Sequence, residues 1–98
     1  MIDILGTIIH ALYQTEPIMI TAAQLRAARA LLGMDQRELA QHCGLSLPTI
    51  QRMEASDGVV RGNVESLMKL VDALAHHGIE LIGEGATSSG GGRGVRLK

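Results

Sequence analysis

The side chains best suited to covalent or metal chemistry in this sequence are one cysteine, Cys43, and four histidines. Neighbouring residues on a helix diverge by about 100°, so His76 and His77 do not offer two metal ligands on one face, and His42 falls on a solvent-facing helix position. Cys43 is expected to point inward as a small buried hydrophobe. No nucleophile with a matching base and no metal-ligand cluster is found. The sequence therefore predicts neither an enzyme nor a metal site, and no cofactor.

The composition limits the fold class and the function classes. The 98 residues include one tyrosine and no phenylalanine or tryptophan, so the core must be aliphatic, which favours packed helices. A chain of this length forms one domain with a modest core. The formal net charge of −1 excludes a strongly basic protein that coats nucleic acid. A lone cysteine cannot form an internal disulfide, which fits a reducing, cytoplasmic compartment.

Residues 1–18 are predicted to be an N-terminal amphipathic extension. Apolar residues recur there at helical spacing, at Ile2, Leu5, Ile9 and Leu12. This favours a short helix, with a strand as the alternative because β-branched residues are frequent. The segment is too short and too interrupted to span a bilayer or to act as a signal peptide. We therefore expect no membrane partner, and Met19 is an alternative start residue.

The first helix of the following region begins with a capping box, in which two side chains three residues apart satisfy the free N–H groups of the first turn. Thr21 and Gln24 have this spacing, and the predicted helix runs to Leu32. Leu25, Ala28 and Leu32 are expected to form its inner face.

Two shorter helices joined by a tight turn follow. Asp35 and Glu38 form a second capping box, and the helix that they start ends at Gly44. Glycine tolerates the left-handed conformation of a sharp turn between helices. Ser46 is then a fresh N-cap for a helix over residues 47–55.

This last helix has two distinct faces. Its periodicity places Ile50 and Met53 toward the core, with Glu54 at their margin. Pro48 lies in the first turn, where its missing N–H costs nothing. The outward positions hold Pro48, Gln51, Arg52 and Ala55.

The helix pair and its turn resemble the helix-turn-helix of the Cro and phage-repressor (XRE-like) family of DNA-binding regulators. The residues that carry the resemblance are Leu39, Ala40, Gly44, Leu45, Ile50 and Met53, with Gln36 at the head. The segment LRAARALLG, residues 25–33, is similar to the first helix of that family. The resemblance covers residues 21–78.

The resemblance implies a sequence-specific, double-stranded DNA-binding transcriptional regulator, expected to be a repressor that acts as a homodimer. The helix after the turn would enter the major groove, which assigns DNA contacts to Gln36, Ser46, Leu47, Pro48, Thr49, Gln51 and Arg52. Arg52 would bind guanine and Gln51 adenine, with Gln36 at a phosphate. Leu47 and Pro48 stand where many phage repressors carry polar base readers, which argues against strong sequence specificity.

The resemblance also implies a structural ion pair between Arg29 and Glu54. Arg29 lies beside the inner face of its helix, where an unpaired charge is costly. In the resembled family an arginine of the first helix commonly pairs with a glutamate that ends the recognition helix, and these two residues stand at the matching positions. Two exposed charges that are close by chance are the alternative.

The chain after the helix pair is expected to close the bundle. Residues 55–62 form a predicted loop, and Asn63 caps a further helix. The expected inner face of this helix consists of Val64, Leu67, Val71 and Leu74, broadened by Met68 and Ala75.

Residues 79–82 and 95–98 alternate as short strands on either side of a glycine-rich segment. That segment lacks the lysine and the following helix of a nucleotide-binding loop, so a hairpin loop is expected. A lone hairpin is marginal in water, which makes a second subunit the expected surface for it. The predicted fold is mainly α, a compact four- to five-helix bundle with a short C-terminal β-hairpin. Its divisions are the extension (1–18), the helix-turn-helix domain (19–78) and the Gly-rich hairpin or tail (79–98).

A protein-interaction module, such as an antitoxin or adaptor, is the alternative function. It would use the same helical bundle to hold a protein partner. The weak net charge and the apolar residues Leu47 and Pro48 at outward positions favour this alternative.

Overall fold

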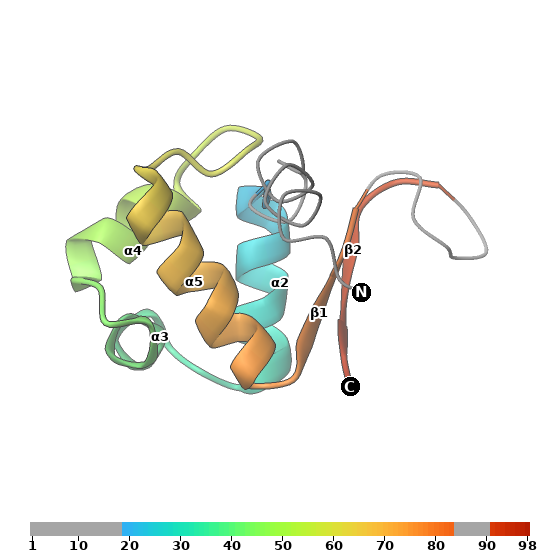
Figure 1. Cartoon of the computed structure of the whole chain (residues 1–98), viewed down its shortest axis with the longest axis horizontal. Helices are drawn as coiled ribbons and strands as arrows, with labels where there is room; N and C mark the ends of the chain where they lie inside the picture. Colours follow the sequence, from blue (N-terminus) through green and yellow to red (C-terminus); the bar gives the residue numbers. More distant parts are fainter. Residues whose placement is uncertain (1–18, 84–90) are drawn as a thin grey trace, which may run out of the picture.

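The computed structural model describes residues 19–83 and 91–98, and the predicted extension over residues 1–18 lies outside them. The elements are α2 (Ala22–Leu32), α3 (Gln36–Cys43), α4 (Leu47–Glu54), α5 (Val64–His76), β1 (Ile79–Ile82) and β2 (Gly94–Leu97). The helices pack around one core, and the two strands form an antiparallel hairpin beside α2 (Figure 1). The predicted mainly α bundle with a short C-terminal hairpin is confirmed.

The helices begin at the predicted caps. The Thr21 side chain accepts a hydrogen bond from the N–H of Gln24 at 3.1 Å, and Gln24 Oε1 accepts one from the N–H of Thr21 at 3.0 Å. Asp35 and Glu38 exchange the same two bonds at 2.7 and 3.3 Å. The other two N-caps are Ser46 for α4 and Asn63 for α5. Each cap joins residues three apart, which is why the sequence alone predicted them.

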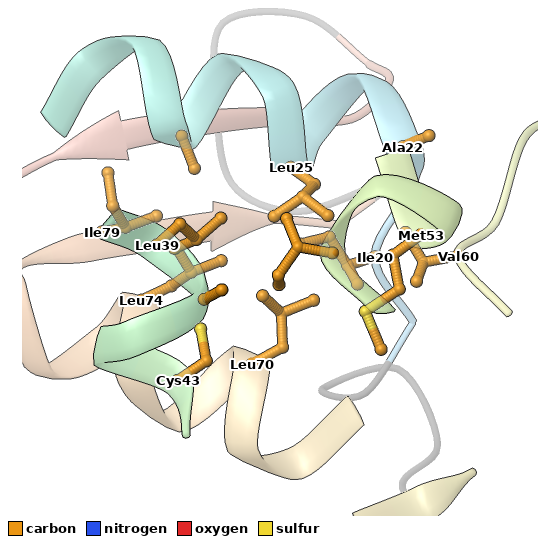
Figure 2. Packing of buried hydrophobic residues seen from close by; sticks show 13 residues of the cluster. Ile20, Ala22, Leu25, Leu39, Cys43, Met53, Val60, Leu70, Leu74 and Ile79 are labelled. Atoms are coloured by element: carbon orange, nitrogen blue, oxygen red, sulfur yellow. The ribbon is translucent and has the colours of Figure 1, made fainter. Parts of the chain in front are cut away.

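The core is aliphatic and draws on every helix. Leu25 of α2, Ile50 of α4 and Leu70 of α5 are each 0% exposed. Figure 2 shows Leu25, Leu39 and Leu70 pointing toward one another from three different helices. This shared interior holds the four helices in one arrangement.

The predicted loop over residues 55–62 also contributes to the core. Val60 is 3% exposed, and its N–H donates to the carbonyl of Ile20 at 2.8 Å. The N–H of Ala22 donates to the carbonyl of Gly58 at 2.8 Å. These bonds tie the loop to the start of α2, a contact between distant parts of the chain that turn composition cannot reveal.

The inner face predicted for α5 is confirmed at Leu67 and Leu74 and is wrong at Val64 and Met68. Leu70 and Leu74 are buried and Leu67 is half-buried, whereas Val64 and Met68 are 59% and 49% exposed. The helix carries two adjacent apolar stripes, so its spacing pattern alone does not select one of them. The surface left open by the other helices decides which stripe is buried.

The C-terminal hairpin packs on its own chain. Ile79 pairs with Leu97 and Ile82 with Gly94, so β2 begins one residue earlier than predicted. The side-chain amide of Gln24 donates to the carbonyls of Ile82 at 3.2 Å and Gly94 at 2.9 Å. Because α2 supplies a surface for the hairpin, the reason for expecting a second subunit there falls away.

Candidate nucleic-acid interface

The turn between α3 and α4 fixes the direction of α4. Gly44 ends α3 with φ 68°, in the left-handed region that favours glycine. The N–H of Leu45 then donates a hydrogen bond to the carbonyl of Ala40 at 3.0 Å, and the Leu45 side chain packs against the core. Only three residues separate the two helices, so their relative orientation is tightly constrained.

The faces of α4 are those that the sequence predicted. Ile50 and Met53 are 0% exposed. The residues of the outer face are all exposed, namely Pro48, Gln51, Arg52 and Ala55. Within residues 19–83 and 91–98, no side chain bonds to the guanidinium group of Arg52 or to the amide of Gln51. The hydrogen-bonding side chains of Gln51 and Arg52 therefore project from a helix whose opposite face is packed against the core.

The beginning of α4 carries two hydroxyl groups held together. Ser46 Oγ accepts from the N–H of Thr49 at 3.2 Å, and the two hydroxyl oxygens lie 2.8 Å apart. Leu47 and Thr49 are half-buried, so they project less than Ser46. A helix start concentrates N–H donors and partial positive charge, which suits a phosphate.

A buried carboxylate joins α4 to α2 and α3. Glu54 Oε2 accepts from Arg29 Nε at 2.8 Å, and Oε1 accepts from Arg29 Nη2 at 3.0 Å. The Glu54 side chain is 4% exposed and that of Arg29 is 25% exposed. The hydrogen bond to Glu54 raises the pKa of Arg29, because it stabilises the charged guanidinium. This is the ion pair that the family resemblance implied.

Gln36 takes part in the same cluster. Its side-chain Nε2 donates to Glu54 Oε1 at 3.2 Å, so the amide is turned inward and is half-buried. As the first residue of α3, Gln36 has a backbone N–H without an acceptor inside the helix. Within residues 19–83 and 91–98, nothing accepts a hydrogen bond from that N–H or from the second amide hydrogen.

Arg26 also binds α4, and the sequence analysis did not predict this contact. Its Nη1 donates to the backbone carbonyl of Glu54, the last residue of α4, at 2.6 Å. A cation at a helix C-terminus complements the helix dipole. The three-residue spacing from Arg26 to Arg29 places both side chains on one side of α2. This spacing is the one feature of the sequence that could have indicated the contact between Arg26 and α4.

Cys43 is buried at the end of α3, as predicted. Burial raises the pKa of its thiol to about 11, against an ordinary thiol pKa of about 8.5. At pH 8 the thiolate, which is the reactive form, is therefore a much smaller fraction of Cys43 than of an exposed cysteine.

The Cys43 thiol is therefore expected to react with a disulfide reagent only when the protein opens. Its labelling rate at pH 8, followed by absorbance across a urea series, should rise in step with unfolding because the intact core excludes the reagent. The same reagent with the urea-unfolded chain is the control. Fast labelling of the native protein at the unfolded rate would contradict the burial.

The histidines are partly brought together by the fold. The rings of His42 at the end of α3 and His77 after α5 lie 4.5 Å apart between centroids and 75° apart in plane. The neighbouring His76 has its ring 5.9 Å from that of His77. In the described part of the chain, no three histidine, cysteine, aspartate or glutamate side chains are placed to hold a metal ion.

Comparisons with known proteins agree with this geometry. A helix-turn-helix domain family model matches residues 21–77, a range that includes all four described helices. No curated protein matches the sequence. None of the described helices is long and apolar enough to cross a membrane. Because the match spans more than half of the 98 residues, the chain belongs to the helix-turn-helix domain family.

Proposed function

We propose that this protein is a sequence-specific, double-stranded DNA-binding transcriptional regulator of the Cro and phage-repressor type. It acts as a homodimeric repressor and places α4 in the major groove. The observation that carries the proposal is the outer face of α4, where Gln51 and Arg52 project from a helix whose inner face is buried. A rigid helix with free hydrogen-bonding side chains is what reading of base edges requires.

The contacts divide between bases and backbone. Arg52 binds guanine through its two-pronged guanidinium group, and Gln51 binds adenine. Pro48 and the half-buried Leu47 offer apolar surface to thymine methyl groups. Gln36 binds a phosphate at the start of α3, and Ser46 and Thr49 at the start of α4 make secondary contacts to phosphates or bases.

The Glu54 cluster is the support for this interface. Arg26 and Arg29 on α2 bind the carbonyl and the carboxylate of the same α4 residue. Together with Gln36 of α3 they hold α4 at a fixed angle to the rest of the bundle. Base contacts depend on such fixed geometry, because a misplaced side chain loses both of its hydrogen bonds.

Arg52→Ala is expected to weaken binding to the preferred duplex by about 1–3 kcal/mol and to relax preference at one base position. Arg52→Lys is the matched control. It keeps the charge but loses the planar fork, so it should retain most affinity for unrelated duplexes without the base preference. The measurement is binding of each variant to preferred and scrambled duplexes over a salt series, because phosphate contacts make affinity salt-dependent.

Gln36→Ala provides the contrast to Arg52. Loss of its phosphate contact should weaken binding to both duplexes by a similar factor, since phosphate oxygens carry no direct sequence information. The Gln36 amide also donates to Glu54, so an additional loss at the preferred duplex alone would report a change in the position of α4, and urea unfolding of the variant measures that structural effect. The preferred site itself is found by selecting bound sequences from a random duplex pool, and a homodimer predicts an inverted repeat.

A protein-interaction module is the second candidate function. The net charge of −1 and the apolar Leu47 and Pro48 at the start of α4 favour it. If folded wild-type protein binds no duplex at low salt, or if Arg52→Ala leaves affinity and base preference intact, this second function replaces the first.

A further inference from the structure

The C-terminal ends of α3 and α5 meet at a pair of histidine rings. His42 lies in the last turn of α3, and His77 is the C-cap of α5. The two ring centroids are 4.5 Å apart and the ring planes are 75° apart, so the edge of one ring meets the face of the other. This arrangement is favourable between uncharged rings. The pair therefore joins the helix-turn-helix to the helix that closes the bundle.

A surface groove beside the pair collects titratable groups from both helices. In the part of the chain that the structure describes, α2, α4 and the hairpin add none to its lining. Burial raises the pKa of the Cys43 thiol to about 11, so this group is neutral between pH 5 and pH 8. Lys69 lies 3.5 Å from Glu65, one turn earlier on α5. The titratable side chains that line the groove are His42, Cys43, Lys69, Asp72, His76 and His77.

The charge of this groove depends on its imidazoles. While these are neutral, the charge of Lys69 balances that of Asp72. Histidine is the side chain that ordinarily gains its charge between pH 8 and pH 5. Once the imidazoles are charged, they and Lys69 together face Asp72. The charges of His42 and His77, with ring centroids 4.5 Å apart, then repel each other across the contact between the helices.

We propose that the His42–His77 pair is a pH-sensitive joint between α3 and α5, which protonation opens. Both rings lie at helix C-termini, where one positive charge is favourable, so the joint tolerates a first proton and a second proton opens it. The opened form binds more protons than the closed form. Opening therefore becomes more favourable as the pH falls.

Opening of the joint affects the region that carries the candidate nucleic-acid interface. α3 begins with Gln36, whose side-chain amide binds the buried Glu54 of α4. Only three residues join α3 to α4, so a movement of α3 is transmitted to the turn between them. The joint itself requires no DNA, and its test is made without DNA.

Cys43 is the reporter of opening, because it is buried on α3 next to His42 and lines the same groove. Its rate of reaction with a pyridyl disulfide, which modifies thiols at acid as well as neutral pH, is measured on the full chain at pH 8 and pH 5 and at one ionic strength. The rate of the urea-unfolded chain divided by that of the native protein gives a protection factor at each pH. This ratio removes the pH dependence of the thiol chemistry itself.

Protection of Cys43 in the wild-type protein should fall about five- to tenfold from pH 8 to pH 5. The factor is moderate because His42 is exposed and water screens part of its charge. His42→Gln and His77→Gln each leave a polar side chain that takes up no proton. Protection in these two variants should therefore be nearly equal at the two pH values.

His76→Gln is the matched control. The His76 ring lies 5.9 Å from that of His77, on the α5 side of the contact, so this variant should keep most of the fall in protection. Asp72→Asn tests the charge balance in the opposite direction. It removes a carboxylate that lines the groove and should enlarge the fall.

Urea unfolding of each variant at both pH values separates opening of the joint from loss of the whole fold. The Cys43 protection of the wild-type protein should fall by a larger factor than its equilibrium constant for global folding. In the same experiment, a double-mutant cycle of His42→Gln and His77→Gln should give a favourable coupling at pH 8 that is lost at pH 5.

Three results overturn the joint. The first is equal protection of wild-type Cys43 at pH 8 and pH 5. The second is a fall that persists in full in both His42→Gln and His77→Gln, which would mean that other groups carry the acid response. The third is a fall no larger than the loss of global stability, which would mean that the whole domain opens.

Discussion

Replacing Arg29 with methionine is expected to lower the free energy of unfolding by about 3–5 kcal/mol. The Glu54 side chain is 4% exposed, so without Arg29 its carboxylate stays buried and keeps only the 3.2 Å bond from Gln36. Methionine fills the volume of the aliphatic part of the arginine side chain. The loss of unfolding free energy therefore measures the removal of the charge and not the creation of a cavity. Urea unfolding followed by far-ultraviolet circular dichroism gives the measurement.

Glu54→Gln is the matched change on the other side of the pair. It keeps the size of the side chain and one acceptor for Arg29 but removes the negative charge. Arg29 is 25% exposed and can turn toward water, so the expected loss is smaller, about 1–3 kcal/mol. A loss below about 1 kcal/mol for Arg29→Met would show that the pair contributes no more than an exposed one.

Leu70→Ala is expected to cost about 2–5 kcal/mol of unfolding free energy. Leu70 is 0% exposed and points into the interior opposite Leu25 (Figure 2). Shortening it removes buried apolar surface and leaves a cavity that helices fixed by their caps cannot fully close. Thermal and urea unfolding of the variant measure the loss.

Val64→Ala on the same helix provides the control. Val64 is 59% exposed, so its truncation should change stability by no more than about 0.5 kcal/mol when measured in dilute protein, where dimerisation does not contribute. A larger loss for Val64→Ala than for Leu70→Ala would mean that α5 buries the face expected from spacing alone.

Short-range patterns in the sequence were sufficient to locate the helices and the face of α4. Each N-cap bond joins residues three apart, as in Thr21 with Gln24 and Asp35 with Glu38, so the information lies within one helical turn. α4 has one apolar stripe, made by Ile50 and Met53, and periodicity therefore identifies its inner face without ambiguity.

The Arg29 and Glu54 pairing is long-range and came from family resemblance. Spacing within one helix cannot identify a partner on another, and the matching positions in a known family supplied that information. The structure adds the bidentate geometry and the burial of Glu54, which make the pair costly to break.

Contacts between residues far apart in the sequence decided which face of α5 is buried and which backbone groups Gln24 and Arg26 bind. α5 carries two adjacent apolar stripes, and the space between the other helices selected Leu70 over Val64 for the core. Gln24 and Arg26 bind backbone carbonyls of the hairpin and of α4. Every residue has a carbonyl group, so such a bond leaves no pattern in the sequence and exists only once the fold brings donor and acceptor together.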